Sequence, residues 1–167
     1  MASCRKTPQG IQLTLEANEV DLIHFLGREL TRLVENGDPT HHSLRPFHPT
    51  QQRERDPESV VAGLEADLDL ALMQTRLERI LQIQDTLLHR DKETDVLQVT
   101  LDETHTDTWL AYLADVRLLL SAVVGITPEN PDPFSEQDEE DWTVEMKMYE
   151  FLSVLQEWLL DAVMGQD

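Results

Sequence analysis

Two short segments with the same alternation of apolar and polar residues constrain the fold of this 167-residue chain more than any other feature. Residues 11–16 (Ile-Gln-Leu-Thr-Leu-Glu) and 97–102 (Leu-Gln-Val-Thr-Leu-Asp) match position by position at an offset of 86, from 11 to 97. Alternation with a period of two predicts half-buried β-strands, the second of them over residues 94–101. A lone strand leaves its backbone groups unpaired, so we expect the two segments to pair as a two-stranded β-ribbon.

The similarity continues beyond the strands and predicts an internal repeat. Under the same offset Asn18 corresponds to Thr104 and Asp21 to Asp107, and each pair has the spacing of a helix-capping box. We therefore expect two strand–helix–helix units related by a pseudo-twofold axis. The alternative is a coincidence between two amphipathic strand–helix junctions.

Apolar residues three and four positions apart predict helices over most of the remaining chain. The expected helices run over residues 18–36, 58–89 (as one bent helix or two), 104–125 and 141–164. The inward-facing residues of these helices should include Leu30, Leu68, Trp109, Leu113, Val116, Leu120, Val123, Val144, Met148, Leu152, Leu155, Leu159 and Ala162. The expected fold class is mainly α, with four to five helices packed as a bundle beside the short two-stranded β-ribbon.

The length suits a single helical domain over residues 1–167, since compact domains usually run to roughly 100–200 residues. Residues 1–10 show no periodicity and are expected to be disordered. Residues 36–57, with four prolines and three histidines, and residues 126–141, rich in proline and acids, are expected to be long loops.

The charge excludes several classes of partner. The chain has 13 basic and 33 acidic residues, for a formal net charge of −20, whereas binding to a nucleic-acid backbone depends on lysine and arginine. The longest charge-free apolar stretch, residues 118–126, is far shorter than the roughly 20 residues that span a membrane. No secretory signal is visible, and Cys4 is the only cysteine, so a cytoplasmic location is expected.

The sequence contains no recognisable catalytic motif. We find no glycine-rich phosphate loop, no nucleophile elbow and no cysteine–histidine pair, so we expect a protein that is not an enzyme and has no cofactor. His41, His42 and His48 lie near Asp38, but zinc sites usually take four ligands, often thiolates, so exposed loop histidines are the better interpretation.

Two carboxylate–histidine pairs keep an alternative open. Asp21 with His24, and Asp102 with His105, have the i,i+3 spacing that helical di-metal sites use. The alternative function is therefore a metal-dependent enzyme with carboxylate and histidine ligands on its helices.

Four residues of the predicted helices are candidates for binding: Trp109, Asp115, Arg117 and Trp158. Arg117 lies inside an apolar helix, where it can pair with a carboxylate such as Asp67 or Asp69, or hold an anionic ligand. The tryptophans can pack in the core, and Trp158 can instead anchor a protein–protein interface.

Three stretches resemble an actinobacterial family known as domain of unknown function 2017. The first comprises Asp38-Pro39, Leu44-Arg45-Pro46 and Asp56-Pro57-Glu58, and it adds Arg45 to the candidate binding residues. The second runs from Leu101 to Thr127 and includes Asp115-Val116-Arg117-Leu118, and the third covers residues 149–157. The chain departs from the family pattern at Ala114, where the pattern has asparagine, and at Ala122–Val123, where it has arginine.

The resemblance implies a cytoplasmic protein of uncharacterised role. It also suggests a link to Clp-type proteolysis, because genes of the family are thought to lie often beside the Clp adaptor gene. We therefore expect a non-catalytic interaction or regulatory module that binds a protein partner or forms a homodimer. Apolar residues outside the main helical stripes would form such an interface: Phe25, Leu70, Leu87, Phe151 and Trp158.

The charge generates a first testable prediction. Carboxylates crowded within a Debye length repel one another, so added salt should stabilise the fold. We expect the melting temperature to rise between about 0.01 and 0.15 M NaCl, over which the Debye length falls from about 30 to 8 Å. A melting temperature that stays constant or falls over this range would contradict the prediction.

Overall fold

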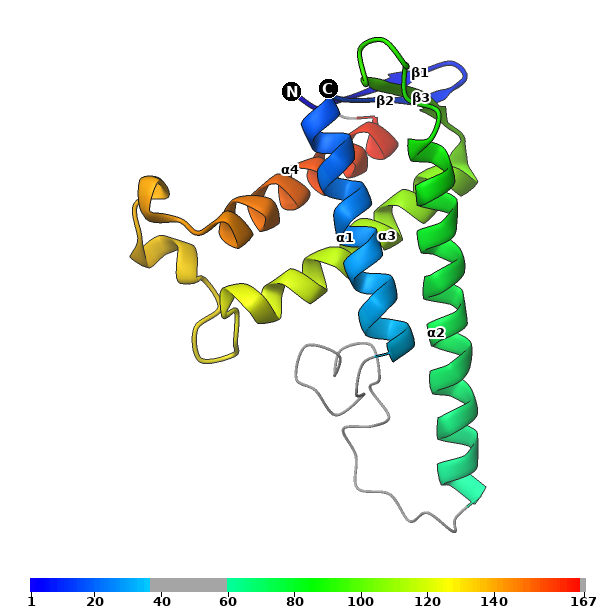
Figure 1. Cartoon of the computed structure of the whole chain (residues 1–167), viewed down its shortest axis with the longest axis vertical. Coiled ribbons are helices and arrows are strands. Elements are labelled where there is room, and N and C mark those ends of the chain that lie inside the picture. Colours follow the sequence, from blue (N-terminus) through cyan, green and yellow to red (C-terminus); the bar gives the residue numbers. More distant parts are fainter. Residues whose placement is uncertain (37–59, 166–167) are drawn as a thin grey trace.

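The computed structural model describes residues 1–36 and 60–165, with side chains over residues 1–35 and 70–165. Figure 1 shows a small sheet lying across the ends of four helices, which confirms the mainly α fold class. The elements are β1 (Ser3–Thr7), β2 (Gly10–Leu15), α1 (Ala17–Asn36), α2 (Val60–Leu87), β3 (Leu97–Leu101), α3 (Glu103–Val124), the 3₁₀ helices η3 (Pro133–Glu136) and η4 (Glu139–Asp141), and α4 (Val144–Met164). Apart from residue 36, the loop predicted at 36–57 lies outside the described residues.

The first ten residues form part of the sheet, so the prediction that they are disordered is wrong. β1 pairs antiparallel with β2 from Ser3–Thr14 to Thr7–Gly10, and the sheet has three strands in the order β1-β2-β3 instead of the two expected. Residues 8 and 9 make a turn, and Gly10 follows with a positive φ of 139°. β1 has no apolar alternation because only one of its faces touches the core, through small side chains such as Cys4.

The two strands predicted from the repeat pair with each other, as expected. Ile11 lies opposite Leu101, Leu13 opposite Val99 and Leu15 opposite Leu97 in an antiparallel ladder. This register is symmetric with respect to the repeat: Ile11 pairs with Leu101, and their counterparts 86 positions away, Leu97 and Leu15, pair with each other. The Leu13–Val99 pair lies at the centre of this symmetry. β2 is followed by α1, and β3 is followed by α3. Because the two strands are antiparallel, the two equivalent strand–helix junctions lie at opposite ends of the ladder, one after Leu15 and the other after Leu101.

Both helices after the paired strands begin earlier than predicted. Glu16 directly precedes α1, and its backbone N–H donates to the Glu19 carboxylate at 2.8 Å, as in a capping box. Asp102 caps α3 by accepting the backbone N–H of His105 at 2.8 Å. Asn18 and Thr104 therefore lie inside the helices. The two observed start positions, 16 and 102, still correspond under the offset of 86.

The core fills the space between the helix pairs and the sheet. α1 packs on α2, α3 packs on α4, and α3 also contacts α1 and α2. Leu13, Leu30, Val116 and Leu155 are all at most 1% exposed, whereas the side chain of Leu68 lies outside the described ones. The predictions for Val123 and Val144 are wrong, because these residues lie at the outer ends of α3 and α4 and are 57% and 63% exposed.

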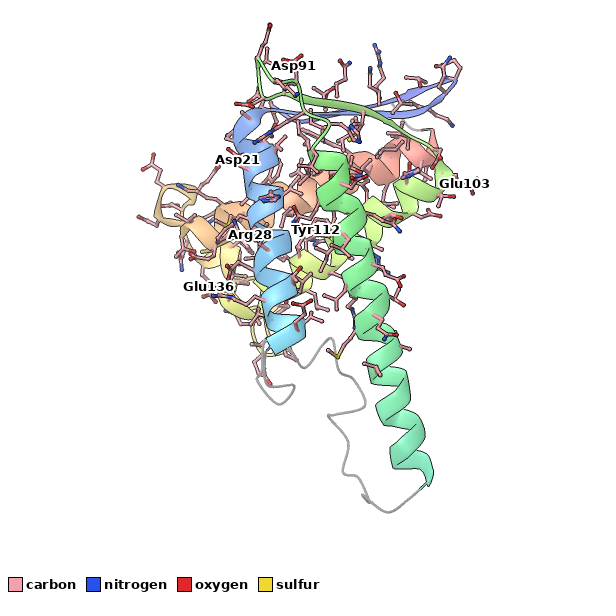
Figure 2. All side chains as sticks on the ribbon, turned by 45° about the vertical axis from the view of Figure 1, so that its right-hand side comes forward. Asp21, Arg28, Asp91, Glu103, Tyr112 and Glu136 are labelled. Atoms are coloured by element: carbon pink, nitrogen blue, oxygen red, sulfur yellow. The ribbon has the colours of Figure 1, made fainter. Side chains whose placement is uncertain are left out.

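Tyr112 joins α3 to α1 at the centre of the molecule (Figure 2). Its side chain is fully buried, and its hydroxyl donates to the Ile23 carbonyl at 2.7 Å. Burial raises the pKa of this phenol, and the charge of Asp115 adds to the effect. A Cβ at Gly27 would lie 2.9 Å from the Tyr112 hydroxyl and 2.5 Å from Gln84 Nε2, so the absence of a side chain there permits the close approach.

Two expectations about the other elements are also settled. α2 is one continuous helix over Val60–Leu87, and the loop at 126–141 contains the short helices η3 and η4. Among the helices that the structure describes, none has an 18-residue stretch apolar enough to cross a membrane.

The hairpin between β1 and β2 generates a prediction about two glycines. A Cβ at Gly10 would lie 2.2 Å from the Leu101 carbonyl oxygen of β3, at a backbone φ of 139°. We expect Gly10→Ala to lower the free energy of unfolding by about 3 kcal/mol, measured by urea denaturation. Gly125, which ends α3 at φ 83° with no atom within 4 Å of its added Cβ, is the matched control. Gly125→Ala should cost about 1 kcal/mol. Equal losses in the two variants would contradict the close contact at Gly10.

Candidate functional site

The five candidate residues from the sequence do not form a single site. Asp115 faces α2, Arg117 faces α4, Trp109 is 1% exposed in the core, and Trp158 lines a surface hollow. Arg45 lies outside the described residues. Asp115 and Arg117 separate because each helical residue advances the side chain by about 100° around the helix axis, which places positions two apart on nearly opposite faces.

Asp115 forms a partly buried ion cluster with two arginines of α2. Its Oδ2 lies 2.6 Å from Arg79 Nη1, and its Oδ1 lies 3.7 Å from Arg76 Nε. Burial raises the pKa of the Asp115 carboxyl, and the neighbouring arginines partly oppose this effect. Burial also lowers the pKa of Arg76. The same residues line a hollow of about 290 Å³ together with Thr75 and Ala114, one of the departures from the family pattern.

Arg117 lies between α3 and α4, where it contacts side chains of α4. Its Nη2 donates to the Tyr149 hydroxyl at 3.2 Å, and its Nη1 donates to Gln156. The guanidinium carbon lies 5.2 Å from the centre of the Tyr149 ring, a cation–π distance. Arg117 is on the face of α3 that packs on α4. The side chains of Asp67 and Asp69, the partners that we expected, lie outside the described ones.

The 126–141 segment supports this side of the molecule through aromatic contacts. Phe134 of η3 stacks on Tyr149 with ring centres 5.6 Å apart, and it meets Trp142 edge to face at 5.0 Å. Arg117 therefore extends an aromatic cluster that fixes the loop to α4. These contacts indicate a structural role for Arg117.

Trp158 of α4 lies beside the free edge of the sheet, between two hollows. The larger, which we call the β1–α4 groove, has a volume of about 370 Å³ and is lined by residues 2–6, Trp158, Asp161, Ala162 and Gly165. The smaller, of about 130 Å³, is lined by apolar groups that include Met1, Phe151 and the other side of Trp158. Among the five candidates, Trp158 is thus the one that meets a large hollow beside unpaired backbone.

A third hollow adjoins the groove beyond Lys6. It has a volume of about 400 Å³, and Lys6 and Ala162 line both hollows. Its far side is acidic, with Asp102, Glu103 and Asp107 from the start of α3. Figure 2 shows Glu103 at this end of the molecule, far from Glu136 at the opposite end.

The residues that line the groove from β1 were missed by the sequence analysis. Cys4, Arg5 and Lys6 all fall in the segment that we expected to be disordered. The available signal was the turn sequence at residues 8–10, Pro-Gln-Gly, directly before the β2 alternation. Burial raises the pKa of the Cys4 thiol to about 11, so the thiol is uncharged at neutral pH.

The apolar residues expected at a dimer interface are scattered. Phe25 and Leu70 are 51% and 54% exposed, Phe151 and Trp158 are partly buried, and Leu87 is buried in the core. The expectation for Leu87 is therefore wrong, since the last turn of α2 directs it inward.

The carboxylates of the two carboxylate–histidine pairs have structural partners. Asp21 accepts from Arg90 Nη1 at 2.8 Å, and Asp102 caps α3 while it contacts His105 Nδ1 at 2.7 Å. Within residues 1–35 and 70–165, no three His, Cys, Asp or Glu side chains come together as a group that could hold a metal ion. The loop histidines at 41, 42 and 48 lie outside the described residues.

The ion cluster generates a prediction about stability. Removing Asp115 leaves two arginines partly buried without their shared carboxylate, so Asp115→Ala should lower the free energy of unfolding by about 3 kcal/mol. Asp21→Ala is the matched control, because it removes a carboxylate whose bond to Arg90 is of similar length but exposed to solvent. This control should change stability little. Urea denaturation of both variants measures the difference, and similar losses would contradict a role for burial at Asp115.

Comparison with known proteins gives one family. No curated protein and no solved structure matches the chain. The sequence model of the family described as "Domain of unknown function (DUF2017)" matches residues 1–163. The resemblance found from the motifs is thus confirmed over almost the whole chain. The chain belongs to the family of domain of unknown function 2017.

Proposed function

We propose that this protein is a non-catalytic binding module that acts on a protein partner through the β1–α4 groove. The observation that carries the proposal is the position of Trp158, which lies beside a hollow of about 370 Å³ at the free edge of a β-sheet. Tryptophan is enriched among residues that dominate the energy of protein–protein interfaces. Backbone at a sheet edge can also pair with a partner chain.

The surface around the groove supports a protein ligand. Val163, in the last turn of α4, is 47% exposed and lines the hollow that adjoins the groove. The groove therefore combines the Trp158 side chain with an open strand edge, and an exposed aliphatic side chain lies in the adjoining hollow.

The alternative, a metal-dependent enzyme, has less support. The carboxylates of Asp21 and Asp102 already hold Arg90 and the start of α3. Elemental analysis of the purified protein tests this alternative, since a stoichiometric transition metal would favour it over the binding module.

The proposal includes a cytoplasmic location and a regulatory role. The single cysteine, with a thiol that burial keeps protonated, is compatible with a reducing compartment. A role in Clp-type proteolysis is supported only by the family resemblance, and the partner's identity would test it directly.

Site-specific photo-cross-linking in a lysate of the source organism tests the function. A benzoylphenylalanine replaces Ser3, an exposed residue that lines the groove, and the matched control carries the same cross-linker in place of the exposed Phe25 on α1. We expect a discrete protein to cross-link at position 3 and not at position 25. The added substitution Trp158→Ser should abolish this product, with thermal melts to verify that the variant is folded. Identical products at both positions, or none at position 3, would contradict the proposal.

A further inference from the structure

We infer that the β1–α4 groove takes an extended acidic segment of the partner protein, which adds to the sheet as a fourth strand beside β1. This inference rests on the proposed binding function and specifies the partner's chemistry. It draws on three observations: the free edge of β1, the alternation of the side chains along it, and the unmatched positive charge of its residues.

The edge of β1 is open to a further strand. β1 is the terminal strand of the sheet, and in the described part of the chain it pairs only with β2. In an antiparallel pair, every second residue directs its N–H and C=O groups away from the neighbouring strand. A new strand would lie about 4.8 Å from β1, on the side where residues 2–6 line the groove.

The two faces of β1 select different side chains of such a strand. Cys4 faces α4 and the core, so the side chains beside it on the added strand would meet Trp158 and Ala162. Arg5 lies on the outer face, where its Nη2 donates to Gln12 of β2 at 2.7 Å. The groove therefore suits a segment that alternates apolar side chains toward α4 with acidic side chains beside Arg5.

The charge at this edge is opposite to that of the chain as a whole. The protein has a net charge of −20, yet β1 carries the adjacent cations Arg5 and Lys6. Within the described residues, no carboxylate lies within 4.0 Å of either cation. Opposite charges on neighbouring strands stabilise their pairing, so Arg5 on the outer face favours an acidic side chain beside it. Lys6 shares the face of Cys4, and its Nζ lies near Gly165 at the end of α4, so it adds positive charge at the groove without facing the acidic side chains.

The same charges disfavour a second copy of this chain as the occupant. Antiparallel pairing of two β1 strands would bring Arg5 and Lys6 of each copy close to those of the other. Like charges on directly facing strands destabilise the pair, and charged residues at sheet edges commonly prevent self-association. The geometry thus favours a different, acidic chain.

Peptide binding to the full-length protein tests the inference. The probe is an acetylated, fluorescein-labelled peptide of about six residues, the usual strand length, that alternates valine and glutamate. Fluorescence anisotropy should show saturable binding that weakens with added NaCl. The same peptide with lysine in place of glutamate should not bind. Equal binding of both peptides would overturn the charge selection.

Two N-methylated peptides test the backbone pairing separately. One is methylated on the valine amides and the other on the glutamate amides, and a strand turns only one of these sets toward β1. We expect one peptide to lose binding at least tenfold while the other keeps it. Retention by both, or loss by both, would overturn pairing through a single strand edge.

Protein variants locate the site. Arg5→Glu with Lys6→Glu should weaken binding about tenfold or more, since Arg5→Glu places repulsion directly beside the acidic side chains and Lys6→Glu removes the other positive charge of the edge. Lys92→Glu, at an exposed turn, is the control with the same charge change per residue and should bind as the unmodified protein does. Cys4, the only cysteine, provides an independent readout, because a bound peptide should slow its alkylation by iodoacetamide, followed at about pH 9 because the thiolate is the reacting form. Unchanged alkylation at saturating peptide would overturn the placement in the groove.

Light scattering tests whether a second copy of this chain occupies the groove instead of an acidic segment. A mass of twice 19.2 kDa that persists in the Lys92→Glu variant and disappears with the β1 double variant would assign the groove to a second copy. The cross-linking result distinguishes a failure of this inference from a failure of the proposed binding function. If a partner cross-links at position 3 but the acidic peptide does not bind, the binding function stands and the partner chemistry proposed here is wrong.

Discussion

The antiparallel pairing of β2 with β3 is the interaction on which the rest of the structure depends. It brings together two segments that are 86 residues apart and places the starts of α1 and α3 at opposite ends of the same short ladder, after Leu15 and after Leu101. Because the register is symmetric about Leu13 and Val99, each helix that follows leaves the sheet in an equivalent way. The four helices then bury the apolar face of the sheet, and Tyr112 fastens α3 to the backbone of α1 through Ile23. A two-stranded ribbon alone would be marginal, and it is the helices that stabilise it.

The few basic residues of this acidic chain are used at junctions between elements. Arg79 and Arg76 join α2 to α3 through Asp115, and Arg117 joins α3 to α4 through Tyr149. The side chains of these cations are partly buried, and each contacts a polar group of a neighbouring helix. Arg5 and Lys6 differ from them, because they lie on an edge strand that no other strand covers within the described residues. This distribution places two cations on the edge of β1 in a negative molecule, whereas α4 contributes Asp161 to the opposite wall of the groove. The chemical preference proposed for the groove therefore comes from its strand edge.

Much of the fold could be predicted from the sequence, because helices and half-buried strands produce regular apolar patterns. The four helices and the pairing of the two alternating segments were predicted in this way, and Gly125 ends α3 as expected. The sequence did not predict β1, because its side chains contribute little to the core and therefore leave no apolar pattern. The strand is stabilised by its backbone hydrogen bonds to β2. The helix starts were displaced by two residues, since Glu16 and Asp102 can cap a helix as well as the residues that follow them. Of the candidate site residues, Trp158 lines the β1–α4 groove, whereas Trp109 is buried in the core.

The sequence by itself determined the mainly helical class, the acidic surface, the internal repeat and the family. These properties depend on local periodicity, composition and motif order, which need no knowledge of distant contacts. Only the tertiary structure decided that Asp115 contacts α2 whereas Arg117 contacts α4. It also decided that β1, with Cys4, Arg5 and Lys6, lines one groove together with Trp158. The physical reason is that a groove forms between elements from the two ends of the chain. Its existence depends on how α4 packs under the sheet, and no local pattern in either segment specifies that packing.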